Sequence, residues 1–150
     1  MGHTYTNCMY HVIFSTKHRQ RLIDSQVSGR LCPYFGGIIR DLGGQLLEVN
    51  AIEDHAHLFA ILPPKHAVSE QVKQIKSGTS KWVHQTFENL QGFAWQEGYA
   101  AFSVSQSGVQ QLRQYIQGQA EHHRRVSFEE EFTAFLDRHG IEYDPKYAFD

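Results

Sequence analysis

Two histidines one residue apart are the first feature of this chain that could do chemistry. His55 and His57 lie in IEDHAHLFAIL, a stretch otherwise typical of a buried β-strand. Because side chains alternate across a strand, both imidazoles project from one face within reach of a single metal ion, while Ala56 and Leu58 face the core. The chain holds ten histidines, so the pair alone also fits two hydrogen-bonded, half-exposed side chains.

A second group of polar side chains lies in QYIQGQAEHH, residues 114–123. In a helix, Tyr115 and Gln119 are neighbours at positions i and i+4, and His122 follows on the same stripe. Gly118 is a poor choice for the interior of a helix with a purely structural role. The alternative is a core tyrosine whose hydroxyl reaches water.

The order of the expected elements is β-α-β-β-α-β. Runs of apolar, β-branched and aromatic residues predict strands at 4–15, 45–53, 55–62 and 99–105. Apolar residues at helical spacing predict helices at 25–42, at 69–90, from about Ser107 through Tyr115, and at 127–139. This order predicts an α+β, ferredoxin-like fold: a four-stranded antiparallel sheet with helices on one face and further C-terminal helices appended.

The last helix has clear end signals. Ser127 and Glu130 resemble a capping box at its start, and Gly140 is a plausible stop. The acids at 129–131 are expected at this helix start because the helix dipole favours negative charge there.

The length predicts one domain over residues 1–150, with 127–150 as a C-terminal helix and acidic tail. Cys8 and Cys32 form no C-x-x-C pair, so neither a disulfide framework nor a zinc ribbon is implied, and a reducing cytoplasm is expected. The apolar runs are too short to span a bilayer and the N-terminus has no secretory pattern. We therefore expect a soluble protein without a membrane partner.

The charges are unevenly distributed along the chain. Of its 16 acids and 14 bases, seven acids and two bases fall in residues 127–150, which leaves nine acids and twelve bases in residues 1–126. The body is mildly basic and the tail is acidic. This balance permits a phosphate-bearing partner without requiring one.

Several segments in one order carry a resemblance to a known family. They are YHVIFSTKHR at 10–19, EDHAHL at 53–58, WQEGYAAFSVS at 95–105, YIQGQAEHH at 115–123, SFEEEF at 127–132 and HGIEYDPKY at 139–147. With the β-α-β-β-α-β order, they resemble the HUH single-tyrosine transposases of small bacterial insertion sequences, which include the repeat-associated tyrosine transposases. The resemblance runs nearly from end to end.

The resemblance implies a role for each residue of the two polar groups. His55 and His57 fall on the family's metal-binding histidines, Tyr115 on its nucleophile and Gln119 on its third metal ligand. Ala56, between the two histidines, departs mildly from the family's pattern, because the family often has a larger hydrophobic residue there. The implied cofactor is Mg²⁺ or Mn²⁺, although imidazoles also invite softer ions.

The resemblance also implies an activity and partners. The family cleaves and rejoins single-stranded DNA through a 5′-phosphotyrosine, near hairpins at the element ends, and works as a homodimer with shared active sites. Such chemistry needs no external energy source, which agrees with the lack of a nucleotide-binding motif. Residues that could contact DNA are Lys17, Arg19, Arg21, Lys73, Lys76, Lys81, Arg113, His122 and His123, each of which could also be a solvated surface residue.

Two other functions stay open at this point. The chain could be a single-strand nucleic-acid binding module that no longer cuts, with Phe93, Trp95, Tyr99 or Phe102 stacking on unpaired bases, although such aromatics more often form core. It could also be a metal-dependent phosphoesterase that uses water as its nucleophile, in which Tyr115 is structural.

Overall fold

The computed structural model describes residues 2–150, and its centre is one antiparallel sheet. The sheet consists of β1 (Met9–Ser15), β2 (Gln45–Ile52), β3 (His55–Ile61) and β4 (Ala100–Ser103), in the order β2-β3-β1-β4. Each neighbouring pair is antiparallel, with β3 and β1 in the middle. The predicted ferredoxin-like sheet is therefore confirmed.

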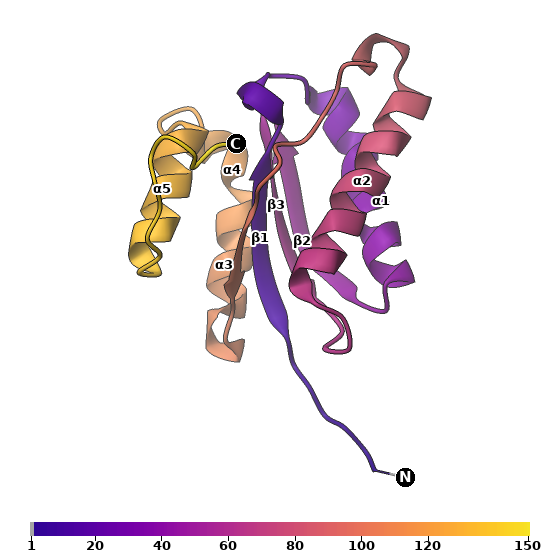
Figure 1. The fold of residues 1–150 in the computed structure, drawn as a ribbon, viewed down its shortest axis with the longest axis vertical. Helices are drawn as coiled ribbons and strands as arrows, with labels where there is room; N and C mark the ends of the chain where they lie inside the picture. The colour runs from indigo at the N-terminus through magenta and orange to yellow at the C-terminus, as the bar shows by residue number, and fades with distance from the viewer. Residues whose placement is uncertain (1) are drawn as a thin grey trace.

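Two long helices cover one face of the sheet (Figure 1). They are α1 (Ser25–Asp41) and α2 (Val68–Thr86), and three short 3₁₀ turns lie elsewhere at Lys17–Arg19, Glu88–Leu90 and Gln106–Gly108. The core between these helices and the sheet is apolar and includes Val12, Phe14, Leu31, Phe35, Ile39, Ala56, Leu58, Val72, Ile75 and Trp95. Within residues 2–150, no helix combines the length and the apolar character needed to cross a membrane.

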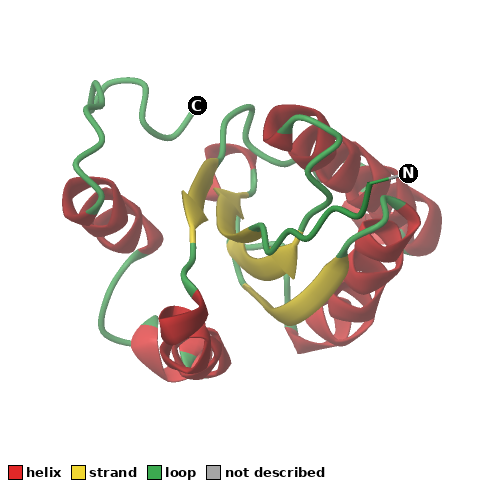
Figure 2. Cartoon of the chain, turned by 90° about the horizontal axis from the view of Figure 1, so that it is seen from below, coloured by secondary structure: helices red, strands yellow, loops and turns green. Residues whose placement is uncertain are grey.

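The C-terminal helices cover the opposite face, so the expectation of helices on one face holds only for α1 and α2. They are α3 (Val109–Gln117), α4 (Gln119–His122) and α5 (Phe128–Arg138), and the view from below shows the sheet between the two helix layers (Figure 2). Their apolar contacts with the sheet include Ile13, Phe59 and Phe102. These helices bury a face that a ferredoxin-like sheet would otherwise expose.

Several predicted boundaries were wrong. The first strand begins at Met9 rather than residue 4, because Met9 pairs with Ile61, the last residue of β3, and residues 2–8 belong to no strand. Helix α2 begins at Val68 after an N-cap at Ala67, so Ser69 lies inside the helix. The end signals of α5 are confirmed, since the Glu130 N–H donates to Ser127 Oγ over 3.2 Å and Gly140 has φ 65°.

The register of the sheet decides where the two histidines point. His55 lies opposite Ser15 and His57 opposite Ile13 across the β1–β3 pair. Ala56 packs in the core beneath α1 and α2, so both histidines project toward α3, α4 and α5. The predicted alternation along this strand is confirmed, and it turns the imidazoles toward the C-terminal helices.

A glycine pair forms the tight connection between α1 and β2. Gly43 has φ 94°, a left-handed conformation that glycine adopts without strain. A Cβ atom at Gly44 would collide with the carbonyl oxygen of Ile61 and lie 3.2 Å from Cγ2 of Ile39. The backbone at Gly44 therefore passes β3 at a distance that only glycine permits.

We expect Gly44→Ala to lower the free energy of unfolding by about 2 kcal/mol, because the backbone must shift to remove this overlap. The matched control is Gly29→Ala in the exposed part of α1, where a Cβ meets nothing within 4 Å. There the substitution should raise stability by roughly 0.5 to 1 kcal/mol. Urea denaturation followed by circular dichroism measures both, and equal effects of the two substitutions would contradict this account.

Candidate metal centre and active site

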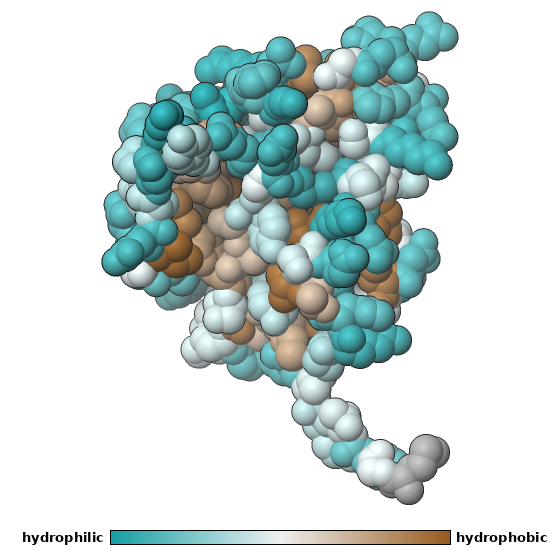
Figure 3. Space-filling view, viewed as in Figure 1, coloured by the Kyte–Doolittle hydropathy of each residue, from teal (hydrophilic) through white to brown (hydrophobic). Residues whose placement is uncertain are grey.

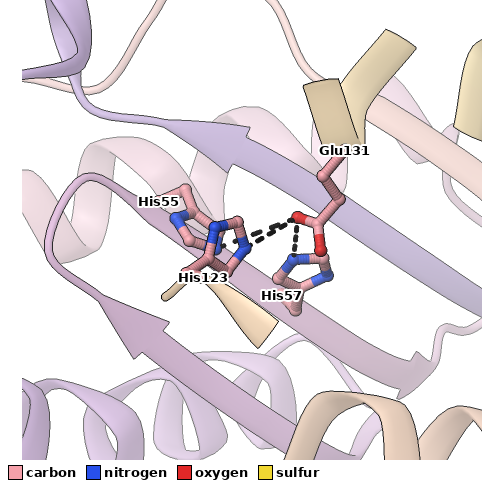
Figure 4. Close-up of side chains that lie close together, drawn as sticks. All are labelled: His55, His57, His123 and Glu131. Carbon is pink, nitrogen blue, oxygen red and sulfur yellow. Dashed lines mark hydrogen bonds and ion pairs between the residues drawn. The ribbon is translucent and has the colours of Figure 1, made fainter. Parts of the chain in front are cut away.

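A cluster of imidazoles around one carboxylate lies between the sheet and the C-terminal helices (Figure 4). His55 and His57 come from β3, His123 directly follows α4, and Glu131 comes from α5. Their ligand atoms all lie within 4.8 Å of one another. Residues far apart in the sequence therefore converge on one small volume.

One oxygen of the Glu131 carboxylate faces the histidines of the cluster. The Nε2 atom of His57 lies 2.8 Å from Oε1 of Glu131, and the Nε2 atom of His123 lies 3.2 Å from the same oxygen. The Nε2 atom of His55 is 3.9 Å away. A carboxylate only accepts hydrogen bonds, so the imidazole N–H groups of His57 and His123 donate to it.

The other carboxylate oxygen faces the tyrosine helix. The Tyr115 hydroxyl donates a hydrogen bond to Oε2 of Glu131, and the side-chain amide of Gln119 donates to the same oxygen over 3.2 Å. His122 Nε2 lies 3.2 Å from this oxygen and 3.4 Å from the Tyr115 hydroxyl. Glu131 therefore joins the strand histidines to the tyrosine.

Gly118 separates Tyr115 from Gln119 by ending one helix before the next begins. Its N–H bonds to the Gln114 carbonyl and its own carbonyl accepts from the His122 N–H, so the chain bends without losing its backbone hydrogen bonds. Gln119 becomes fully buried, with Oε1 3.1 Å from Nε2 of His55. The predicted single stripe is thus split at Gly118, yet Tyr115 and Gln119 both reach the cluster.

A third buried histidine lies beneath the cluster. His11 on β1 places Nε2 2.8 Å from Nδ1 of His57, and the two rings are stacked at 25°. His55 has a comparable partner, since its Nδ1 lies 2.9 Å from Oδ1 of Asp54. Partners of this kind orient an imidazole and decide which of its nitrogens carries the proton.

Burial lowers the pKa values of the two histidines His57 and His11. Burial lowers the pKa of His57 to about 4, although its bond to Glu131 acts in the opposite direction. Burial and the neighbouring His57 also hold the pKa of His11 well below its ordinary value. Both histidines are therefore neutral at pH 7, and a neutral imidazole has a lone pair that can bind a metal.

Glu131 and Tyr115 shift in opposite directions. Burial by itself raises the pKa of Glu131, but hydrogen bonds from His123 and His57 outweigh it and hold that pKa far below its usual range. Burial and the bond to Glu131 raise the pKa of the Tyr115 hydroxyl. At neutral pH the carboxylate is ionised and the tyrosine keeps its proton, so the hydroxyl must lose that proton as it attacks.

The donor set fits a divalent metal ion. Metal–ligand distances of about 2.0 to 2.3 Å put two ligands of one ion at most about 4.6 Å apart, so ligand atoms within 4.8 Å of one another can meet an ion after shifts of a few tenths of an ångström. Imidazole nitrogens suit the softer transition metals, while the oxygens of Glu131 and Gln119 suit Mg²⁺ and Mn²⁺.

Access to the cluster is limited from every side. His55, His57, Gln119 and Glu131 are each at most 3% exposed. The side chain of His122 is 32% exposed and Tyr115 is half-buried, so the tyrosine side of the cluster is the most open. Tyr115 and His122 are therefore the most accessible side chains of the cluster, and a separate cavity borders His55 and His123.

The predicted DNA-contacting residues are dispersed over the molecule. Arg19 and Arg21 line a cavity of about 190 Å³ together with His55 and His123, and Arg19 also pairs with Glu129 at 2.8 Å. His122 and His123 belong to the cluster itself. The remaining bases lie outside it: Arg113 bonds to the Leu47 carbonyl, Lys17 lines a separate cavity with the C-terminus, and Lys73, Lys76 and Lys81 belong to α2 on the opposite face of the sheet.

Sequence reasoning missed two residues of this site. Glu131 was attributed to the helix dipole alone, yet it shares the stripe of Phe128, Phe132 and Phe135, where an acid signals a buried charge with partners. His11 alternates with Val12 on β1, but only the fold tells which side of that strand faces the C-terminal helices.

Solved structures with this fold define the class of the protein. A crystal structure described as a candidate transposase of Deinococcus radiodurans has a TM-score of 0.65 and 26% identity, covering 79% of this chain and 96% of that one. The structure of a REP-associated tyrosine transposase bound to a REP hairpin has a TM-score of 0.60 at 17% identity, covers 100% of this chain and 91% of that one, and supports the fold alone. The neighbour at 26% identity indicates the class of the transposases.

The chain belongs to the IS200-like transposase family, whose model matches residues 4–119. Among curated relatives, the IS200 transposase of Salmonella typhimurium is 27% identical over 130 residues, covering 81% of this chain and 82% of the relative. The ISDra2 transposase of Deinococcus radiodurans is 24% identical over 115 residues, covering 73% and 82%. The protein is thus an enzyme that acts on DNA.

The depressed pKa of His57 predicts a pH-dependent stability of the metal-free protein. Its folded-state pKa of about 4 lies below the ordinary 6.5, so the unfolded chain takes up a proton first as the pH falls. The free energy of unfolding is therefore highest above pH 6.5. It falls by on the order of 3 kcal/mol as the pH decreases to 4.

Urea denaturation with a chelator present, between pH 7.5 and 4, measures this loss. His57→Gln should flatten the pH dependence, because it removes the titrating ring while it keeps a donor for Glu131. Parallel curves for the two proteins would show that His57 does not carry the effect.

Proposed function

We propose that this transposase cleaves and rejoins single-stranded DNA at insertion-sequence ends, with Tyr115 as its nucleophile and a divalent metal ion as its cofactor. The observation that carries the proposal is the meeting of the Tyr115 hydroxyl with His55 and His57 at one buried cluster. The two groups lie on elements that are about sixty residues apart in sequence. Neither a structural tyrosine nor a structural histidine pair needs the other.

Tyr115 forms the covalent intermediate in this proposal. Its hydroxyl oxygen bonds to phosphorus while the bond from phosphorus to the 3′ oxygen breaks, which leaves a 5′-phosphotyrosine and a free 3′ hydroxyl. Glu131 already accepts the hydrogen bond of this hydroxyl and is the group positioned to take its proton. The phosphotyrosine keeps the energy of the broken bond, so rejoining needs no nucleotide cofactor.

The metal ion, Mg²⁺ or Mn²⁺, would be held by His55, His57 and the side-chain oxygen of Gln119, with Glu131 and His123 as further ligands at the same cluster. When bound, such an ion stabilises the negative charge on the phosphate oxygens. The three ligands expected from the sequence are all neutral, whereas the Glu131 carboxylate adds one negative charge to the ligand set.

His11 supports the metal site from beneath. For Nε2 of His57 to bind a metal, the ring proton must sit on Nδ1, and His11 Nε2 lies 2.8 Å away to accept it. The lowered pKa of His11 keeps its ring neutral at pH 7, and in the tautomer with the proton on Nδ1 the Nε2 atom can act as this acceptor.

The DNA partner proposed here is single-stranded and carries hairpins near the element ends. Arg19 and Arg21, in the cavity beside His55 and His123, are the bases best positioned for its phosphates. Lys76 is less available, because its ammonium group donates to the carbonyls of Glu97 and Gly98.

The tyrosine helix docks on its own chain. Asn50 of β2 donates to the Ile116 carbonyl over 3.0 Å, and Arg113 donates to the Leu47 carbonyl over 2.8 Å. These bonds support an active site that is complete within one subunit. The homodimer with shared sites implied by the family stays a prediction. An exchange of α3 between subunits would first have to break these two hydrogen bonds.

One observation favours a second function. His55, His57, Gln119 and Glu131 are at most 3% exposed, so a chain that binds single-stranded nucleic acid without cutting it would also suit this closed cluster. The two functions differ in whether a covalent bond to DNA forms.

The proposed function predicts a covalent adduct. Incubation with single-stranded DNA from the element ends and Mg²⁺ or Mn²⁺ should give a protein–DNA product that survives denaturant, and Tyr115→Phe should reduce its rate by roughly 10³-fold or more. Binding without an adduct would favour the non-cutting module. Cleavage that persists in Tyr115→Phe would favour water as the nucleophile.

The metal site predicts a graded loss of Mn²⁺ affinity, measured by titration calorimetry or by the electron paramagnetic resonance of free Mn²⁺. His57→Ala should abolish binding, and His11→Leu should weaken it by about 10- to 100-fold, because His57 loses the acceptor for its ring proton. His11→Gln should restore part of the affinity through its amide oxygen. His66→Ala, an exposed histidine away from the cluster, is the control. Unchanged affinity in His57→Ala would refute this assignment.

A further inference from the structure

A second cavity shares Tyr115 with the cluster but lies outside it. It has a volume of about 390 Å³ and extends between α3, α5 and the end of β4. Figure 3 shows hydrophobic side chains in a hollow beside α5 on this face. Its walls include Tyr115, Phe102, Phe135, Arg138 and His139. His11 also lines this space, but none of the proposed metal ligands does.

Three nearly parallel aromatic rings form part of the wall. The centroids of Phe102 and His139 lie 4.1 Å apart with an interplanar angle of 21°. Phe135 is inclined by 22° to Phe102 and by 24° to His139. Phe102 and Phe135 are buried and hold the exposed ring of His139 flat, so the outer face of His139 offers a surface on which another flat ring can stack.

His139 is held in one orientation although its side chain is exposed. Its Nδ1 donates to the Phe135 carbonyl over 2.9 Å, because a carbonyl can only accept. In the neutral ring, Nε2 is then an acceptor. Ser105 and Gln111 add a hydroxyl and an amide group to the same wall. The cavity thus combines flat apolar surfaces with a few hydrogen-bonding groups.

Arg138 adds a positive charge at this wall. Its guanidinium lies 5.1 Å from the centroid of the Phe135 ring, in the geometry of a cation–π contact. An arginine beside stacked aromatics suits a ligand that joins a flat ring to a phosphate. Among the ligands of a DNA-acting enzyme, that description fits a nucleotide.

We infer that this cavity binds one unpaired nucleobase of the DNA strand, next to the phosphate that Tyr115 attacks. The inference rests on the proposed function, because Tyr115 is both the proposed nucleophile and part of the cavity wall. The base unstacks from its neighbours, stacks on the exposed ring of His139, and places its phosphate at the tyrosine hydroxyl. The cavity thereby helps to choose which phosphate is cut.

Photocrosslinking tests the inference without requiring cleavage. The protein is Tyr115→Phe, which keeps the ring in the wall, in the presence of a chelator, and the probe is a single-stranded oligonucleotide with one 4-thiothymidine. Crosslinks identified by mass spectrometry should map to the peptides that carry Phe102 and His139. Crosslinks confined to other surfaces would overturn the inference.

Matched variants measure the contribution of the wall. His139→Ala should weaken oligonucleotide binding about tenfold, the loss expected for one stacking contact, whereas His66→Ala, which removes an equally exposed histidine elsewhere, should not. Arg138→Ala should weaken binding more than Arg124→Ala, which removes the same charge from a side chain 76% exposed. Equal effects within either pair would contradict the inference.

A cavity-filling variant separates this inference from the proposed function. Gln111→Trp adds an indole ring from an exposed position of α3 in the cavity wall and should abolish the crosslinks to the wall. Wall crosslinks in a protein that never forms a covalent adduct would support the cavity and refute the proposed function. An adduct that forms at the wild-type rate and position in Gln111→Trp would support the proposed function and refute the cavity.

Discussion

The buried carboxylate of Glu131 is the interaction on which the rest of the structure depends. Removing an ionised carboxylate from water costs several kcal/mol unless partners replace its hydration. Five side chains do so here, from β3, α3, α4 and the segment that follows it. Each partner thereby receives a defined position, so one charge on α5 aligns the strand histidines with the tyrosine helix.

The hydrogen bonds of the cluster form one connected path from the floor of the sheet to the nucleophile. It runs from His11 to His57, on to Glu131, and ends at the Tyr115 hydroxyl. Along this path the protons are assigned by burial and charge together: the histidines are neutral, the carboxylate is ionised and the tyrosine keeps its proton. A change at either end therefore alters the protonation and position of the groups between them.

The cores on the two faces of the sheet differ in composition, and this difference explains which sequence predictions were confirmed. On the face beneath α1 and α2, burial is apolar and local periodicity is enough to identify the helices and the inward residues such as Leu58. On the other face the core is mixed, and α5 joins it through both phenylalanines and Glu131. A pattern that equates burial with apolar character misses an acid that is buried because its partners lie elsewhere in the chain.

The amino-acid sequence by itself determined the order of the elements, the common face of His55 and His57, and the short separation of Tyr115 from Gln119, because these follow from local periodicity and from residue types at close spacing. Only the tertiary structure decided that Glu131 and His11 complete the cluster. The physical reason is that their roles depend on partners on separate elements: His11 meets His57 only through the pairing of β1 with β3, and Glu131 meets the histidines only once α5 packs across the sheet.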